Sequence, residues 1–141
     1  MPSKGTAQWQ GDLKGGTGTF RAGDDITGNY DFKSRFEDGP GANPEQLIGA
    51  AHAACFSMAL SGALGDAGTP PDAVDTEAVV TLRFVDGAPT ITKIALTTVG
   101  RVPGIDQATF VEQAEAAKAG CPVSRALAGV PEITLEASLA E

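Results

Sequence analysis

The chain of 141 residues carries 18 acidic and 10 basic side chains, a formal net charge of -8, and its length suits a single domain over residues 1–141. No cluster of lysines or arginines is present to neutralise a run of phosphates or an anionic bilayer, which excludes nucleic acid and membrane surfaces as expected partners. The first residues lack the apolar core of a secretory signal, and the longest nearly unbroken apolar run, residues 47–60, is too short to cross a bilayer, so a soluble, cytoplasmic protein is expected.

The first third of the chain is expected to form a meander of about three strands. Short runs of strand-forming residues between positions 6 and 36 are separated by Gly-Gly, Gly-Asp and Gly-Asn pairs, which are typical of turns. A Gly-Pro-Gly loop follows. No catalytic residue is expected in residues 17–28.

A central helix is predicted over residues 43–65. Asn43 is a suitable N-cap, Pro44 suits the first helical position, and Glu45 favours the positive end of the helix dipole. The helix is apolar on nearly every face, and a domain of this size has little chain with which to surround it. The pattern therefore predicts a homodimer with this helix near its centre.

The second half of the chain is expected to begin with a hairpin. Two runs of strand-forming residues flank the turn pair Asp86-Gly87. Asp106 is a suitable N-cap for an amphipathic helix that ends at Gly120. A short helix over residues 121–127 and a half-buried strand over residues 132–139 complete the order. This pattern is typical of the α+β class with mostly antiparallel pairing.

The two cysteines are 66 positions apart and do not form the dense framework of a small secreted domain. They are either reactive thiols or two unrelated buried ones. Cys121 follows Gly120 and precedes Pro122, so its thiol is expected at a helix N-cap, where free N–H groups favour a thiolate. Cys55 is expected in the middle of a helix and, if it is reactive, needs a cation from outside its own turn.

Three other interpretations of Cys55 remain open at this point. An isolated cysteine in an Ala-rich helix is often an inert core thiol. His52, three residues earlier, could approach it for hydrolase chemistry, but no orienting group is evident, and a buried or interfacial His52 with one hydrogen bond is the simpler interpretation. Two cysteines, a histidine and a carboxylate could ligate zinc, but the C-x-x-C spacing typical of such sites is absent.

Two segments point to a known family. Residues 30–61, "YDFKSRFEDGPGANPEQLIGAAHAACFSMALS", and residues 118–127, "KAGCPVSRAL", closely resemble the OsmC branch of the OsmC/Ohr family of cysteine-based hydroperoxide reductases. The similarity extends over nearly the whole chain, and "GAAHAACF" is similar to the OsmC branch in particular. The resemblance implies an α+β, OsmC-like fold in which antiparallel sheets wrap around a long buried central helix of an intertwined homodimer.

The resemblance also implies an activity and a set of residues. It implies an antioxidant peroxidase that reduces organic hydroperoxides and uses no metal or other cofactor. Cys55 would be the peroxidatic thiol, Cys121 the resolving thiol, and Arg35 and Glu45 the pair that activates and orients Cys55. The reductant would be a dithiol, and lipoylated proteins are proposed for the Ohr branch. The family also associates the chain with oxidative and hyperosmotic stress.

Helix geometry limits how these residues can meet. Glu45 and Cys55 are ten residues apart, about 15 Å along one straight helix, so they cannot readily share a site within one chain. If two copies of the helix pack antiparallel, Glu45 of one can approach Cys55 of the other. Small residues at Ala51, Ala59 and Gly62 allow close approach. This predicts two composite sites per dimer.

A second function class uses the same cysteines without catalysis. The chain would then be a dimer that senses oxidation or binds a hydrophobic ligand. Apolar residues surround Cys55 in the sequence, and they either form a pocket for an organic hydroperoxide or belong to the core. They are Ile48, Phe56, Met58 and Leu60.

Overall fold

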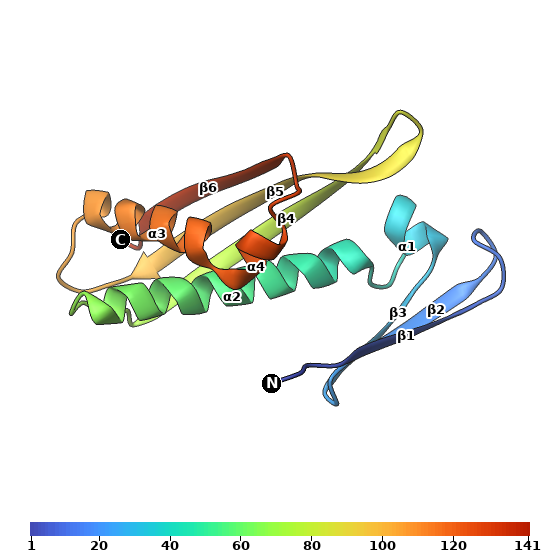
Figure 1. Ribbon diagram of the computed structural model, residues 1–141, viewed down its shortest axis with the longest axis horizontal. Helices are drawn as coiled ribbons and strands as arrows, with labels where there is room; N and C mark the ends of the chain where they lie inside the picture. Colours follow the sequence, from blue (N-terminus) through green and yellow to red (C-terminus); the bar gives the residue numbers. More distant parts are fainter. The chain divides into compact units, whose positions relative to one another are not determined.

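Residues 1–47 and residues 48–141 form two structural units in the computed structural model, which describes all residues from 1 to 141 (Figure 1). The elements follow in the order three strands, two helices, two strands, two helices and one strand. This confirms the predicted α+β class and every predicted element, and it adds one short helix that the sequence did not predict.

The first unit contains a three-stranded antiparallel sheet. Its strands β1 (Gly5–Gln10), β2 (Thr17–Ala22) and β3 (Ile26–Tyr30) follow one another in space as in sequence, as expected for a meander. One face carries three aromatic rings, with the Trp9 and Tyr30 centroids 5.5 Å apart and those of Phe20 and Tyr30 6.2 Å apart.

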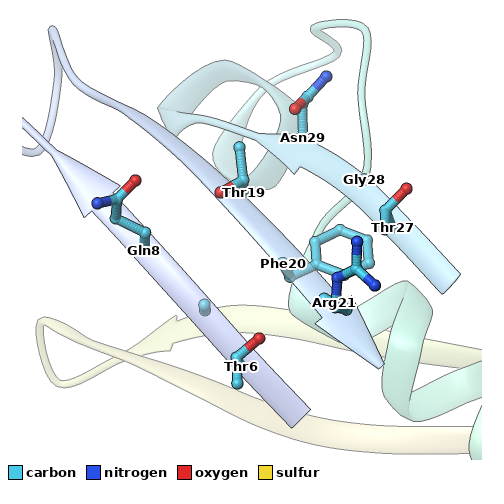
Figure 2. Close-up of a pocket in the computed structure, with 9 residues that line it drawn as sticks. Thr6, Gln8, Thr19, Phe20, Arg21, Thr27, Gly28 and Asn29 are labelled. Carbon is cyan, nitrogen blue, oxygen red and sulfur yellow. The ribbon is translucent and has the colours of Figure 1, made fainter. Parts of the chain in front are cut away.

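The opposite face of this sheet is polar. Because side chains alternate along each strand, every second residue points to this side. Figure 2 shows its side chains around a pocket of about 590 Å³. The side chains that give the pocket its polar character are those of Thr6, Gln8, Thr19, Arg21, Thr27 and Asn29.

The unpredicted element is helix α1 (Phe32–Phe36). Asp31 is its N-cap and accepts a hydrogen bond from the Ser34 N–H at 2.8 Å, while the Ser34 hydroxyl accepts one from the Asp31 N–H at 2.9 Å. This reciprocal capping box satisfies two of the donors that a short helix leaves free. It fixes the turn on which Arg35 lies.

Helix α2 (Pro44–Asp66) is the predicted central helix. The Asn43 carboxamide accepts a hydrogen bond from the Gln46 N–H at 2.8 Å, which confirms the predicted N-cap. The expectation that this apolar segment is too short to cross a bilayer is wrong for the whole helix. With 23 residues and a mean hydropathy of 1.6 in its most apolar window, α2 is long and apolar enough to do so by length and composition. Its side chains Phe56, Leu60 and Leu64 are fully buried, but only 28% of that window is buried in the single chain.

The second unit is built on a sheet with the strand order β4-β5-β6. Strands β4 (Ala73–Val85) and β5 (Ala88–Arg101) form the predicted antiparallel hairpin, and Asp86 and Gly87 both have positive φ at its turn. Strand β6 (Glu132–Leu139) lies parallel to β5, after a crossover through α3 (Gln107–Gly120) and α4 (Pro122–Ala126).

One face of this sheet is covered by α3 and by the part of α2 after residue 48 (Figure 1). Nine buried apolar side chains form the shared core. Each large one contributes about 1.5–3 kcal/mol by leaving water. They are Phe56, Leu60, Leu64, Ile94, Leu96, Val102, Phe110, Ala114 and Ala117.

The other side of α2 is apolar but exposed within the single chain. We call it the exposed stripe of α2; it consists of Ala51, Ala54, Met58, Ser61, Gly62 and Gly65. Met58 is 79% exposed, an unusual state for a large apolar side chain in a folded protein. Cys55 lies at the edge of this stripe and is partly exposed. The burial of the central helix that the sequence predicts is therefore incomplete in one copy of the chain.

Candidate functional site

The two cysteines, distant in sequence, are neighbours in the second unit. Cys55 comes from the middle of α2, and Cys121 lies between α3 and α4. Both are free thiols, and each is near enough to the other to shift its pKa. The fold therefore brings together two thiols that are 66 positions apart in the sequence.

Cys121 caps helix α4. Its sulfur accepts a hydrogen bond from the Ser124 N–H at 3.3 Å, which confirms the predicted N-cap position. Burial alone raises the pKa of the Cys121 thiol, but hydrogen bonds from the Ser124 side chain and backbone, together with one from Cys55, hold that pKa below its usual value. Within the pair, the negative charge is favoured on Cys121.

Cys55 has the opposite electrostatic environment. Burial raises the pKa of its thiol, the backbone N–H of Val123 lowers it, and the Cys121 side chain raises it again. The positive charge of Arg125 acts to lower it, but the net pKa stays above the usual value. Cys55 is partly exposed and Cys121 is only 1% exposed, so the less acidic thiol is the one that a substrate can reach.

Arg35 and Glu45 form an ion pair in the first unit. The Arg35 Nε donates to both Glu45 carboxylate oxygens, at 3.2 and 3.3 Å, and Nη2 donates to Oε1 at 2.8 Å. The Glu45 side chain is 8% exposed and that of Arg35 is 35% exposed. Such a fork fixes the plane of the guanidinium, which also stacks against Phe36 at 5.4 Å.

A pocket beside Arg35 was not predicted from the sequence. Its volume is about 460 Å³, and Arg35 forms part of its wall. The rest is mostly aromatic, and no spacing in the sequence indicates that these rings gather. The aromatic lining consists of Trp9, Tyr30, Phe32 and Phe36.

The structure thus brings together the four predicted site residues as two pairs. Arg35 and Glu45 belong to residues 1–47, and Cys55 and Cys121 belong to residues 48–141. Phe56, which the sequence left open as pocket or core, is fully buried core. No group of three or more histidine, cysteine, aspartate and glutamate side chains suited to a metal ion is found in residues 1–141.

His52 is a buried residue with one hydrogen-bond partner, as the simpler of its two interpretations predicted. That partner is Ser124. It is fully buried, and its Nε2 lies 2.7 Å from the Ser124 Oγ. Burial lowers the pKa of His52, so the imidazole is neutral at pH 7. The sequence did not indicate Ser124 as its partner, because the two residues are far apart in the chain.

The buried His52 is expected to make the protein less stable in acid. Its pKa is lower in the folded than in the unfolded chain, so its contribution to stability is complete above about pH 6.5. As the pH falls below that value, the unfolded chain binds a proton that the folded chain does not. The free energy of unfolding should fall by up to about 1.4 kcal/mol per pH unit more in the wild type than in His52→Gln.

Urea unfolding between pH 8 and pH 5 measures this difference, because both proteins share the same carboxylates. Equal pH slopes for the two proteins would contradict the assignment of a buried neutral imidazole.

Comparison with known proteins gives one consistent result. The family model described as "OsmC-like protein" matches residues 37–136. The chain is 53% identical over 138 residues to Peroxiredoxin OsmC of Escherichia coli, covering 96% of this chain and 95% of that protein.

Among solved structures, the organic hydroperoxide resistance protein OhrB of Bacillus subtilis is 26% identical, with a TM-score of 0.74 and coverage of 99% of this chain and 98% of that one. An organic hydroperoxide resistance protein from Elizabethkingia anophelis, 23% identical, matches in fold with a TM-score of 0.75 and covers 99% of each chain.

Proposed function

The chain belongs to the OsmC-like protein family, and on that premise we propose that it is a thiol peroxidase that reduces organic hydroperoxides to alcohols. The observation that carries this proposal is the proximity of Cys55 and Cys121, two free thiols in a chain whose close relatives are named peroxiredoxins. Cys55 is the peroxidatic residue, and Cys121 is the resolving residue.

The reaction balances with these two thiols and an external reductant. The Cys55 thiolate attacks the distal peroxide oxygen, the O–O bond breaks, and the alkoxide takes a proton to leave as alcohol. The sulfenic acid on Cys55 then condenses with the Cys121 thiol, forming a disulfide and releasing water. A dithiol reduces this disulfide and is itself oxidised to a disulfide.

Arg35 and Glu45 are proposed to activate Cys55. The Cys55 thiol has a raised pKa within its own unit, so it needs a further positive charge to form a thiolate at neutral pH. The Arg35 guanidinium, held in plane by Glu45, has an uncommitted Nη1 that can supply this charge and stabilise the leaving alkoxide.

An organic group on the peroxide is favoured by the aromatic pocket beside Arg35. Apolar and aromatic walls with a few charged groups, here Arg35 and Asp31, are typical of sites for small organic ligands. A hydroperoxide whose O–O group faces the guanidinium would place its alkyl or aryl group among these rings. Hydrogen peroxide has no such group and gains nothing from the pocket.

The functional unit is proposed to be a homodimer in which residues 1–141 act as a single OsmC-like domain. The exposed stripe of α2 is apolar, carries small residues and lies next to Cys55, so a second copy can cover it. Antiparallel packing would bring Glu45 of one copy towards Cys55 of the other, giving two composite sites. We further propose a cytoplasmic location and a lipoylated protein as the dithiol donor.

Turnover tests the proposed activity. Reduced protein mixed with excess cumene hydroperoxide and dihydrolipoamide should consume many equivalents of peroxide per chain, more rapidly than it consumes hydrogen peroxide. Replacing dihydrolipoamide by a monothiol at the same thiol concentration is the matched control, and it should slow recycling. Oxidation that stops after one equivalent with either reductant would favour a non-catalytic redox sensor.

Dilution tests the composite site. The rate per chain should stay constant while the protein is dimeric and should fall when dilution separates the copies. Met58→Glu, which places a charge on the exposed stripe of α2, should move that fall to higher protein concentration. A monomer with full activity, identified by light scattering at the assay concentration, would exclude a site built from two chains.

A further inference from the structure

We propose that His52 and Ser124 are positioning residues that keep hydrogen-bond donors directed at the sulfur of Cys121. This inference rests on the proposed function of Cys121 as the resolving thiol. The pair contacts neither the peroxide nor the sulfur of Cys55 in the proposed reaction, and it acts only through Cys121.

The three side chains form a chain of contacts in the interior of the second unit. His52 is fully buried, Ser124 is 7% exposed and Cys121 is 1% exposed. The His52 Nε2 lies 2.7 Å from the Ser124 Oγ, and the Ser124 N–H donates to the Cys121 sulfur at 3.3 Å. The Ser124 side chain is also near enough to that sulfur to lower the pKa of Cys121. Ser124 therefore links the imidazole to the thiol.

Counting donors and acceptors fixes the direction of these bonds. The His52 Nδ1 is buried and has no hydrogen-bond partner. A neutral imidazole has one N–H, and a buried N–H without an acceptor is rarer than a buried lone pair without a donor. The proton is therefore on Nε2 and is donated to the Ser124 Oγ. The Ser124 hydroxyl hydrogen is then free to point at Cys121.

This arrangement favours the ionised form of Cys121, because a hydrogen bond to a charged acceptor is stronger than one to a neutral acceptor. The other groups facing the two sulfurs are the backbone N–H of Val123 and the positive charge of Arg125, which acts on Cys55.

In the proposed reaction, Cys121 is therefore already ionised when it attacks the oxidised Cys55. When the sulfur of Cys55 carries a hydroxyl group, the Cys121 thiolate attacks it, the S–S bond forms and the S–O bond breaks. The departing hydroxide takes up the proton that Cys121 had lost, giving water. His52 and Ser124 end the step with the protons they had at its start.

The tautomer of His52 is the first test and needs no substitution. His52 is the chain's single histidine, so the nitrogen NMR spectrum of the reduced protein contains one imidazole. The neutral Nε2–H tautomer is expected at pH 7. The Nδ1–H tautomer, or a charged ring at that pH, would overturn the proposal.

The second test measures the Cys121 thiolate directly, by its ultraviolet absorbance as a function of pH in a Cys55→Ser background. Ser124→Ala should raise the apparent pKa of Cys121 by about one unit, as expected for loss of one hydrogen bond to a charged group. Ser124→Thr should restore it. Ser57→Ala, which removes a hydroxyl bonded to Thr76 at 2.8 Å, is the matched control and should cause no shift.

An unchanged titration in Ser124→Ala, or a failure of Ser124→Thr to restore it, would overturn the proposal. No peroxide is used in either experiment. If the shift and the tautomer are found in a protein that does not turn over peroxide, the proposed function fails and the role of the pair stands.

Discussion

In Cys55→Ser, the rate of peroxide turnover is expected to fall by about a thousandfold or more. A serine hydroxyl is almost fully protonated at neutral pH and is a poor nucleophile towards oxygen. Cys121→Ser should behave differently. It should reduce about one equivalent of peroxide and then stop, since the sulfenic acid on Cys55 has no thiol to condense with. Stopped-flow mixing with cumene hydroperoxide separates the two results.

Labelling with dimedone, which reacts with sulfenic acids, assigns the roles. Cys121→Ser should be labelled after one equivalent of peroxide, and Cys55→Ser should not. The assignment needs this test, because the structure places the lower pKa on Cys121 and the greater exposure on Cys55. We favour access over acidity, since a buried thiolate cannot meet a bulky hydroperoxide. Labelling of Cys55→Ser instead would reverse the two roles.

Arg35→Lys is expected to lower kcat/KM for cumene hydroperoxide by roughly a hundredfold, although it keeps the positive charge. A lysine cannot reproduce the planar fork in which Nε and Nη2 both bind Glu45. Glu45→Gln should lower kcat/KM by about tenfold, because the guanidinium is still present but is held in its orientation by weaker hydrogen bonds. In the double variant, the decrease in kcat/KM should be smaller than the product of the two single decreases, since both substitutions act on the same ion pair.

A distant pair serves as the control for these variants. Lys93 and Glu132 form an exposed ion pair at 4.0 Å on the second sheet, and Lys93→Gln should leave kcat/KM unchanged. Glu45 is nearly buried, so Arg35→Lys is also compared with the wild type by urea unfolding to separate lost stability from lost catalysis. Full activity of Arg35→Lys would mean that Cys55 is activated by another group.

Local signals in the sequence predicted most of the elements. Asn43 and Asp106 cap the helices they were assigned to, and Asp86-Gly87 forms the hairpin turn, because each depends only on residues a few positions away. Helix α1 was missed, because five residues between strand-like segments have no periodicity to detect. The parallel pairing of β6 with β5 depends on a crossover that residue patterns do not specify.

Fewer contacts of the candidate site than elements of the fold could be predicted from the sequence. The N-cap position of Cys121 was predicted from Gly120 and Pro122, but its contact with Cys55 was implied only by the family resemblance. The Ser124 partner of His52 is buried on another helix, and only the folded chain shows it.

The contact between the two cysteines also concerns the stability of the whole second unit. A disulfide between residues 66 positions apart would close a loop that contains β4, β5 and α3. Closing a loop of this length removes conformational entropy from the unfolded chain that corresponds to about 4 kcal/mol. Oxidation of the two cysteines would therefore make the second unit more stable against unfolding, and reduction would remove this stabilisation. The physiological dithiol would set not only the rate of the next cycle but also how readily the protein unfolds.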